Sequence, residues 1–298
     1  MNAILSMVTL GRMRSTAEKL CDQFVPLFRG LKGFKSILLF QILLLALPVQ
    51  LLAQKERVVD IPTRPNVTQR MLVLAPNNPT AAVVLFAGGH GGLQISLDGS
   101  LKWGAGNFLV RTRQLFASNG LMVAVVDAPS DRQNSPYLGG FRQKPEHVAD
   151  IRAVIAWLKQ QANIPVWLVG TSRGTQSAAF IATQLAPADG GPDGVVLSST
   201  ILTDKPPSRP VPEMPLGKIH VPTLIVHHKR DGCGLCKYGD LPNLMDKLSA
   251  VPRKELLTFE GGKNQGDPCE AMAYHGFNGI EQEVVARTAA WITWKGNP

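Results

Sequence analysis

The 298-residue sequence has no internal repeat and no linker that would separate two globular domains. It also has no long run of basic residues, although its formal net charge is +9. The absence of such a run argues against a nucleic-acid partner. Only 18% of the residues are charged and 45% are hydrophobic, a balance typical of one globular domain with a sizeable core.

The N-terminal region lacks an uninterrupted apolar run of the length that a membrane span requires. A basic patch at residues 29–35 precedes the apolar segment 37–47, and the small residue Ala53 follows. This order is typical of a secretory signal peptide, here cleaved after Ala53, which would make the protein periplasmic or secreted. The alternative is an uncleaved anchor formed by residues 37–53, which is shorter than the ~20 apolar residues of a span and is interrupted by polar residues and proline.

We therefore expect an N-terminal extension plus signal peptide at residues 1–53 and a single domain at residues 54–298. Residues 1–53 hold six Lys/Arg and two acidic residues, so +4 of the net charge lies there and +5 remains on the domain. The membrane is expected as a partner only through an uncleaved leader, and the sequence leaves the oligomeric state open.

Short apolar runs alternate with helical patterns through the rest of the chain. Strands that are apolar throughout and alternate with helices imply a parallel sheet covered on both faces. The sequence thus predicts an α/β protein, a three-layer α/β/α sandwich whose sheet is mostly parallel and begins with an antiparallel hairpin. The expected strands are 57–61, 69–74, 82–86, 121–126, 164–169, 195–197, 223–226 and 256–259, and the expected helices include 108–118, 148–158 and 280–292.

Ser172 lies in a G-x-S-x-G motif between a predicted strand and a predicted helix. Gly170 and Gly174 flank it because side chains there would strike the neighbouring strand or helix. The alternative is an ordinary glycine-rich turn. The strand before the motif and the helix after it favour a nucleophilic serine.

A nucleophilic serine needs an imidazole base and an acid that orients it. His275 lies on a turn-rich loop between the last predicted strand and helix, and Asp231 follows the strand at 223–226. The order Ser172, Asp231, His275 is the one expected for a triad on such a sheet. Asp204, which follows the preceding strand, is the alternative acid.

The oxyanion formed in such a reaction needs two hydrogen-bond donors. One expected donor is the backbone N–H of Arg173, at the amino end of a helix. The other should come from the Gly-Gly-His-Gly-Gly loop after the strand at 82–86, at Gly89 or its neighbour His90. A phosphate-binding loop is the alternative, but the spacing of a G-x-G-x-x-G motif is missing.

With these motifs, residues 56–296 resemble the α/β-hydrolase superfamily. The resemblance rests on the G-x-S-x-G turn around Ser172 (the nucleophile elbow), the acid at Asp231 and the base at His275. It implies an eight-stranded sheet of the α/β-hydrolase type and acyl-enzyme chemistry that needs no cofactor and no metal. Gly-Gly-His-Gly-Gly departs from the lipase-type His-Gly-Gly-Gly, which leaves the oxyanion donor open.

Three cysteines follow the leader. In the fold that the resemblance implies, the acid loop and the histidine loop face each other, so a disulfide between Cys233 and Cys269 would fasten them. Cys236 could pair with Cys269 instead. A metal site is a third interpretation, because potential ligands lie within ten residues: His227, His228, Asp231, Cys233 and Cys236. It is weakened because His227 and His228 point to opposite faces if the strand continues through them.

A large lid is not expected, because the segment 200–221 is rich in proline, which opposes helix formation. We therefore predict an open site in which Trp103, Tyr137 and Phe141 contact the substrate.

The leading hypothesis is an exported serine esterase (a carboxylic-ester hydrolase) that acts on a small-molecule or polymer ester. A peptidase, thioesterase or acyltransferase would use the same residues. The alternative from another class is a non-catalytic binding protein of the same fold.

Overall fold

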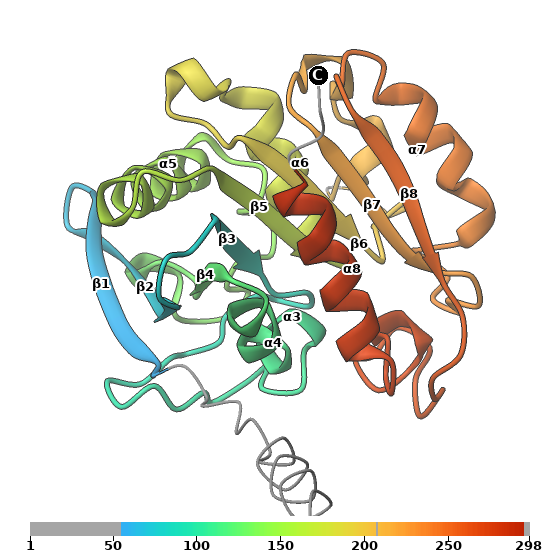
Figure 1. Ribbon diagram of the computed structural model, residues 1–298, viewed down its shortest axis with the longest axis horizontal. Coiled ribbons are helices and arrows are strands. Elements are labelled where there is room, and N and C mark those ends of the chain that lie inside the picture. Colours follow the sequence, from blue (N-terminus) through green and yellow to red (C-terminus); the bar gives the residue numbers. More distant parts are fainter. Residues whose placement is uncertain (1–54, 207, 295–298) are drawn as a thin grey trace, which may run out of the picture. The chain divides into compact units, whose positions relative to one another are not determined.

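Eight strands form one sheet (Figure 1). The computed structural model describes residues 55–206 and 208–294. The strand order is β1-β2-β4-β3-β5-β6-β7-β8. The strands are β1 Arg57–Arg64, β2 Val67–Leu74, β3 Ala81–Phe86, β4 Leu121–Val126, β5 Val166–Thr171, β6 Gly194–Ser198, β7 Thr223–His228 and β8 Lys254–Phe259.

The sheet is parallel from β4 to β8 and antiparallel at its other edge. β1 pairs antiparallel with β2, and β2 pairs antiparallel with β4. The remaining neighbours pair in parallel, so the carboxyl ends of β3, β5, β6, β7 and β8 share one edge. The predicted mostly parallel sheet with an N-terminal hairpin is confirmed.

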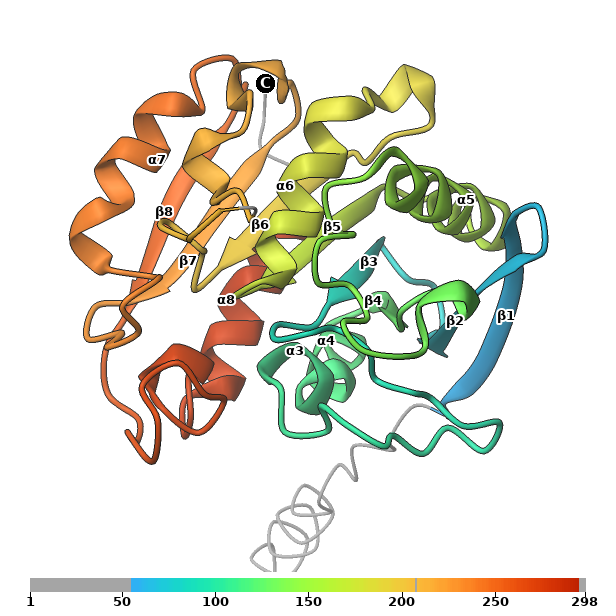
Figure 2. The same cartoon turned by 180° about the vertical axis from the view of Figure 1, so that it is seen from behind.

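Helices cover both faces of the sheet (Figures 1 and 2). Alternate residues of β3 supply the two cores, since Val84 packs on one side and Val83 and Leu85 pack on the other. The first side holds α5 Pro145–Gln161, α6 Gly174–Gln184 and α7 Leu241–Lys247; the second holds α3 Phe108–Arg111, α4 Arg113–Ser118 and α8 Glu281–Thr293. The predicted three-layer sandwich is therefore confirmed.

The stretch predicted as one helix at 108–118 is two short helices that break at Thr112. The buried Thr112 hydroxyl donates a hydrogen bond to the carbonyl of Phe108 at 2.6 Å. Such back-bonding competes with regular helical geometry. The prediction of an uninterrupted helix was wrong at this residue.

The segment between β6 and β7 carries no lid helix among its described residues. It forms two short 3-10 turns, at Val211–Glu213 and Leu216–Lys218. The side-chain amide of Gln176 on α6 donates hydrogen bonds to Ser208 Oγ at 2.9 Å and to the carbonyl of Arg209 at 2.8 Å. The described part of the proline-rich segment is thus tied to α6, and it forms no large lid, as predicted.

The predictions about residues 1–53, the signal peptide and its cleavage, concern a part of the chain outside the described residues. They stay predictions. Among the helices in the described part, none has the length and apolar character required to cross a bilayer.

Candidate active site

Ser172 lies between β5 and α6, at the carboxyl edge of the sheet. Its φ is +52°, in the left-handed region that non-glycine residues seldom adopt. Its N–H donates to the carbonyl of Ser198 at 3.0 Å, which anchors the strained residue to β6. A Cβ at Gly170 would strike the backbone of Gly174, and one at Gly174 would strike the backbone of Phe86. The tight turn therefore requires both glycines.

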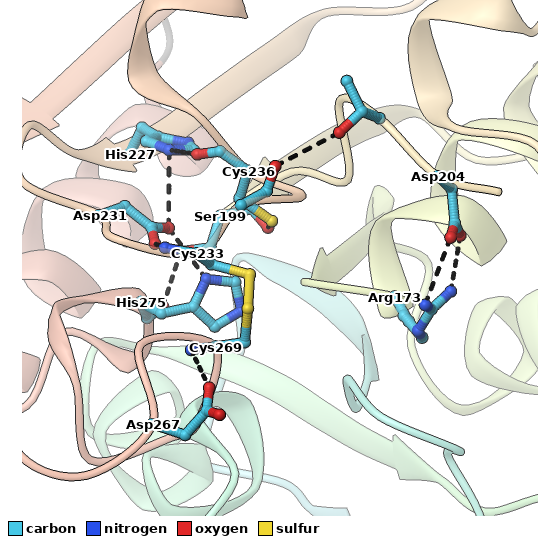
Figure 3. The surroundings of a disulfide bond; sticks show 12 residues. Arg173, Ser199, Asp204, His227, Asp231, Cys233, Cys236, Asp267, Cys269 and His275 are labelled. Atoms are coloured by element: carbon cyan, nitrogen blue, oxygen red, sulfur yellow. Dashed lines mark hydrogen bonds and ion pairs between the residues drawn. A yellow bond between two sulfur atoms is a disulfide. The ribbon is translucent and has the colours of Figure 1, made fainter.

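His275 and Asp231 meet although they lie 44 positions apart in the sequence (Figure 3). Nδ1 of the buried His275 is 2.9 Å from Oδ2 of Asp231. The other Asp231 oxygen accepts the backbone N–H of Cys233 at 2.9 Å. The carbonyl of His275 accepts the hydroxyl of Ser199 at 2.7 Å. Side chain and backbone of His275 are thus both held in place.

His227 is a second imidazole near the same carboxylate, with Nε2 3.6 Å from Asp231 Oδ2. The same nitrogen lies 2.9 Å from the carbonyl of Cys236, a hydrogen-bond contact. Burial lowers the pKa of His227 despite the nearby Asp231 charge, so His227 is neutral at neutral pH. It braces the acid loop and leaves His275 as the partner of the carboxylate.

Ser172 and His275 line one pocket of about 380 Å³ at the sheet edge. Nε2 of His275 is buried and has no hydrogen-bond partner in the described part of the chain. The hydrogen bond between Ser172 and His275 is therefore not formed in this structure. Catalytic hydrogen bonds of this kind often tighten only when substrate binds.

A disulfide joins Cys233 to Cys269 (Figure 3), with an S–S distance of 2.02 Å. It links the loop after Asp231 to the loop before His275, so the predicted pairing is confirmed. Cys236 is a free, buried thiol whose Sγ donates to the carbonyl of Ser199 at 3.3 Å.

Ligand atoms of Cys233, Cys236 and His275 lie within 4.8 Å of one another. Cys233 has no thiolate to offer while it is in the disulfide, so this group supplies two metal ligands at most. His227 and His228, the other candidates, each have Nε2 within hydrogen-bond distance of a backbone carbonyl.

The glycine loop after β3 packs directly on the serine. A Cβ at Gly88 would lie 3.0 Å from the Cβ of Ser172. Gly89 has φ +55°, and a Cβ there would lie 2.7 Å from the ring of Trp103. The backbone N–H groups of Gly89 and Arg173 donate to no other described residue, and both residues line the pocket. These two groups are placed to receive an oxyanion.

His90 does not line this pocket, whereas Gly89 does. The His90 ring stacks on Tyr137 with a centroid distance of 4.4 Å and contacts the tilted ring of Trp103 at 3.8 Å. Its Nδ1 accepts the N–H of Gly92. Burial lowers the pKa of His90, and the charge of Arg142 lowers it further. The structure thus favours Gly89 over His90 as the donor from this loop.

Asp204, the alternative acid, pairs with Arg173 and lies apart from His275 (Figure 3). Its Oδ2 is 2.7 Å from the guanidinium of Arg173. Burial raises the pKa of Asp204, but hydrogen bonds from Arg173 and Ser208 outweigh burial and leave the pKa below its usual value. Asp204 therefore orients Arg173, and no hydrogen bond joins it to His275.

The three aromatic residues predicted to contact substrate differ in position. Trp103 lines the pocket and is 36% exposed. Tyr137 does not line the pocket and stacks on His90 instead. Phe141 is buried against Ala128 and Leu138, so its prediction as a substrate contact was wrong.

Sequence reasoning missed Arg142, which lies under the glycine loop. It is 5% exposed and donates hydrogen bonds to the carbonyls of Ala87 and Gly89, at 3.0 and 3.2 Å, and to Ser177 Oγ at 3.0 Å. No motif or periodicity identifies a buried arginine in a loop.

Comparisons with known proteins agree with this architecture. No protein-family model and no curated protein sequence matches the chain. An esterase of Pyrococcus furiosus is similar in structure, with a TM-score of 0.60, 16% identity, and coverage of 84% of this chain and 95% of that one. A dienelactone hydrolase of Anabaena variabilis matches with a TM-score of 0.54 and 15% identity, over 80% of this chain and 97% of that one. A sugar hydrolase of Lactococcus lactis matches with a TM-score of 0.50 and 16% identity, over 79% of this chain and 97% of that one. The chain therefore has the α/β-hydrolase fold.

Proposed function

We propose that the protein is a serine hydrolase that cleaves carboxylic esters through an acyl-enzyme intermediate. The observation that carries the proposal is the buried 2.9 Å contact between His275 and Asp231 at the pocket that Ser172 lines. The similarity to an esterase and to other hydrolases supports the same reaction class.

In the first half of the reaction, Ser172 Oγ attacks the ester carbonyl carbon while His275 Nε2 takes the hydroxyl proton. Asp231 holds Nδ1–H of His275, which fixes the tautomer that leaves Nε2 free and stabilises the imidazolium. The oxyanion accepts the N–H groups of Gly89 and Arg173. The tetrahedral intermediate then expels the alcohol, which takes the proton from His275, and the acyl group remains on the serine.

In the second half, water attacks the acyl carbon and gives a proton to His275 Nε2. Collapse of the second intermediate breaks the bond to Ser172 Oγ, which recovers the proton from His275. The carboxylic acid product then leaves. The buried acid and base thus act twice with no net change in protonation.

The test combines a fluorophosphonate probe with p-nitrophenyl esters of rising acyl chain length. Wild type should be labelled and should turn over esters, whereas Ser172→Ala should lose labelling and about 10⁶ in turnover. Ser118→Ala, which changes an exposed serine on α4, is the matched control and should behave as wild type. An unlabelled wild type would favour a non-catalytic binding protein, and hydrolysis retained by Ser172→Ala would refute the assignment of the nucleophile.

We also propose that the protein is exported, with its leader cleaved near Ala53. The Cys233–Cys269 disulfide supports this proposal because such bonds persist in oxidising compartments. Sequencing of the N-terminus of the protein purified from the cell envelope or medium tests it, and a start before residue 37 would contradict cleavage.

A further inference from the structure

A second cavity adjoins the active-site pocket and is larger. We call it the cationic groove. Its volume is about 810 Å³, in the range of small-molecule sites. The active-site pocket and the groove share Gly89 and Arg173 in their walls. A substrate bound at Ser172 can therefore extend past the glycine loop after β3 into the groove.

Among the described residues, four cationic side chains and no carboxylate line the groove. The cations are Arg142, Lys144, Arg173 and Arg209. Arg173 is neutralised by Asp204, which lies outside the lining. Lys144 and Arg209 form no ion pair with any described residue. Three positive charges of this groove thus have no counter-ion in the described part of the protein.

Among the four cationic residues of the groove, Arg142 is the buried one. Burial of a charge is costly unless an opposite charge or full hydrogen bonding compensates it. Its partners are two carbonyls and a hydroxyl, all neutral. Burial, followed by the charge of Arg173, lowers the pKa of Arg142 to about 9, so the guanidinium stays charged at neutral pH. Arg142 thus holds the glycine loop in place and also brings a positive charge to the wall of the groove.

The position of His275 decides which half of the ester enters the groove. The leaving alcohol must take its proton from His275, which lines the active-site pocket and not the groove. The alcohol part therefore lies on the His275 side of Ser172. The acyl part can then extend past Gly89, which lines both cavities, into the groove.

We propose that the cationic groove is an acyl-binding subsite for esters whose acyl part carries a second, ionised carboxylate. Arg142 provides buried positive potential, and Lys144 and Arg209 attract the carboxylate from the rim. The inference rests on the ester hydrolysis proposed above and adds a substrate class to it.

The experiment compares two esters that share a six-carbon acyl chain, monoethyl adipate and ethyl hexanoate, by ethanol release from the full chain. Wild type should prefer the anionic ester in kcat/KM by about tenfold at low salt, and 0.5 M NaCl should shrink this preference because it screens the charges. Arg209→Gln and Lys144→Gln should each reduce the preference to about a third of its wild-type value. Lys218→Gln, an exposed lysine outside both cavities, is the matched control and should keep it.

The outcomes separate this inference from the proposed reaction. Hydrolysis of both esters without a preference for the anionic one would overturn the inference and leave the esterase proposal standing. If neither ester is hydrolysed, the esterase proposal fails, and calorimetric titration of adipate into Ser172→Ala decides the groove. The subsite would be supported if adipate binds Ser172→Ala and binds more weakly when Arg209→Gln is added to that variant. The absence of adipate binding to Ser172→Ala would overturn it.

Discussion

The disulfide between Cys233 and Cys269 should control both the stability of the fold and the position of the catalytic base. It joins residues 36 positions apart. In the chain-entropy model, closing a loop of this length stabilises the folded state by about 4 kcal/mol. All of residues 261–270 are exposed, so little core packing replaces the bond once it is removed. For a domain of this size, about 4 kcal/mol corresponds to a fall in Tm of roughly 8–16 °C.

The same change should lower kcat more than it raises KM. The loop that precedes His275 would lose its covalent tether, and a misplacement of about 1 Å can cost about 10² in rate. The substitution is Cys233→Ala together with Cys269→Ala, so that no stray thiol remains. Calorimetric melting and ester hydrolysis give the two readouts.

Reduction of wild type with dithiothreitol should reproduce the effects of the double variant, whereas the double variant itself should not respond to the reductant. A Tm within about 1 °C of wild type together with an unchanged kcat would refute the reasoning. Loss of stability without loss of kcat would show that the remaining contacts of His275 are sufficient to hold it.

Three further predictions follow from the site. Asp231→Asn should lower kcat by about 10⁴, whereas Asp204→Asn should change it far less because Asp204 contacts Arg173 and not His275; the two variants compared with one p-nitrophenyl ester check this. Gly89→Ala should lower kcat by about 10² or more with a folded circular dichroism spectrum, because its Cβ would lie 2.7 Å from the Trp103 ring and the donor N–H would shift. Cys236 should resist iodoacetamide at pH 8 in the native protein and react after unfolding, since burial raises the pKa of its thiol and leaves almost no thiolate; mass spectrometry of the modified protein measures this.

The sequence predicted the sheet and the main site residues because both follow from local signals. Buried parallel strands have continuous apolar sequences. The residues that follow such strands, for example Asp231, lie together at the carboxyl edge of the sheet. The glycines around Ser172 identify the elbow for a steric reason that the structure reproduces. The pairing of Cys233 with Cys269 followed from the fold that the motifs resemble.

The errors and omissions concern features that depend on tertiary contacts. The sequence around an aromatic residue in a loop does not show whether its side chain is exposed or buried. Phe141 was therefore predicted to contact substrate, although its side chain is buried. Nothing in the sequence marks Thr112 as a helix break. The break accompanies a hydrogen bond from its hydroxyl to the carbonyl of Phe108 in the preceding turn. The burial of Arg142 depends on the glycine loop, far away in the sequence, that closes over it.

The contact between the rings of Trp103 and His90 has a practical consequence. Trp103 is one of five tryptophans in the chain and lines the active-site pocket. Its indole lies against Gly89, so any ligand that enters between Trp103 and the serine must alter the ring's surroundings. The protein therefore carries an intrinsic fluorophore at the mouth of its site, and emission spectra recorded against Trp103→Phe can follow occupancy in real time without a chromogenic substrate.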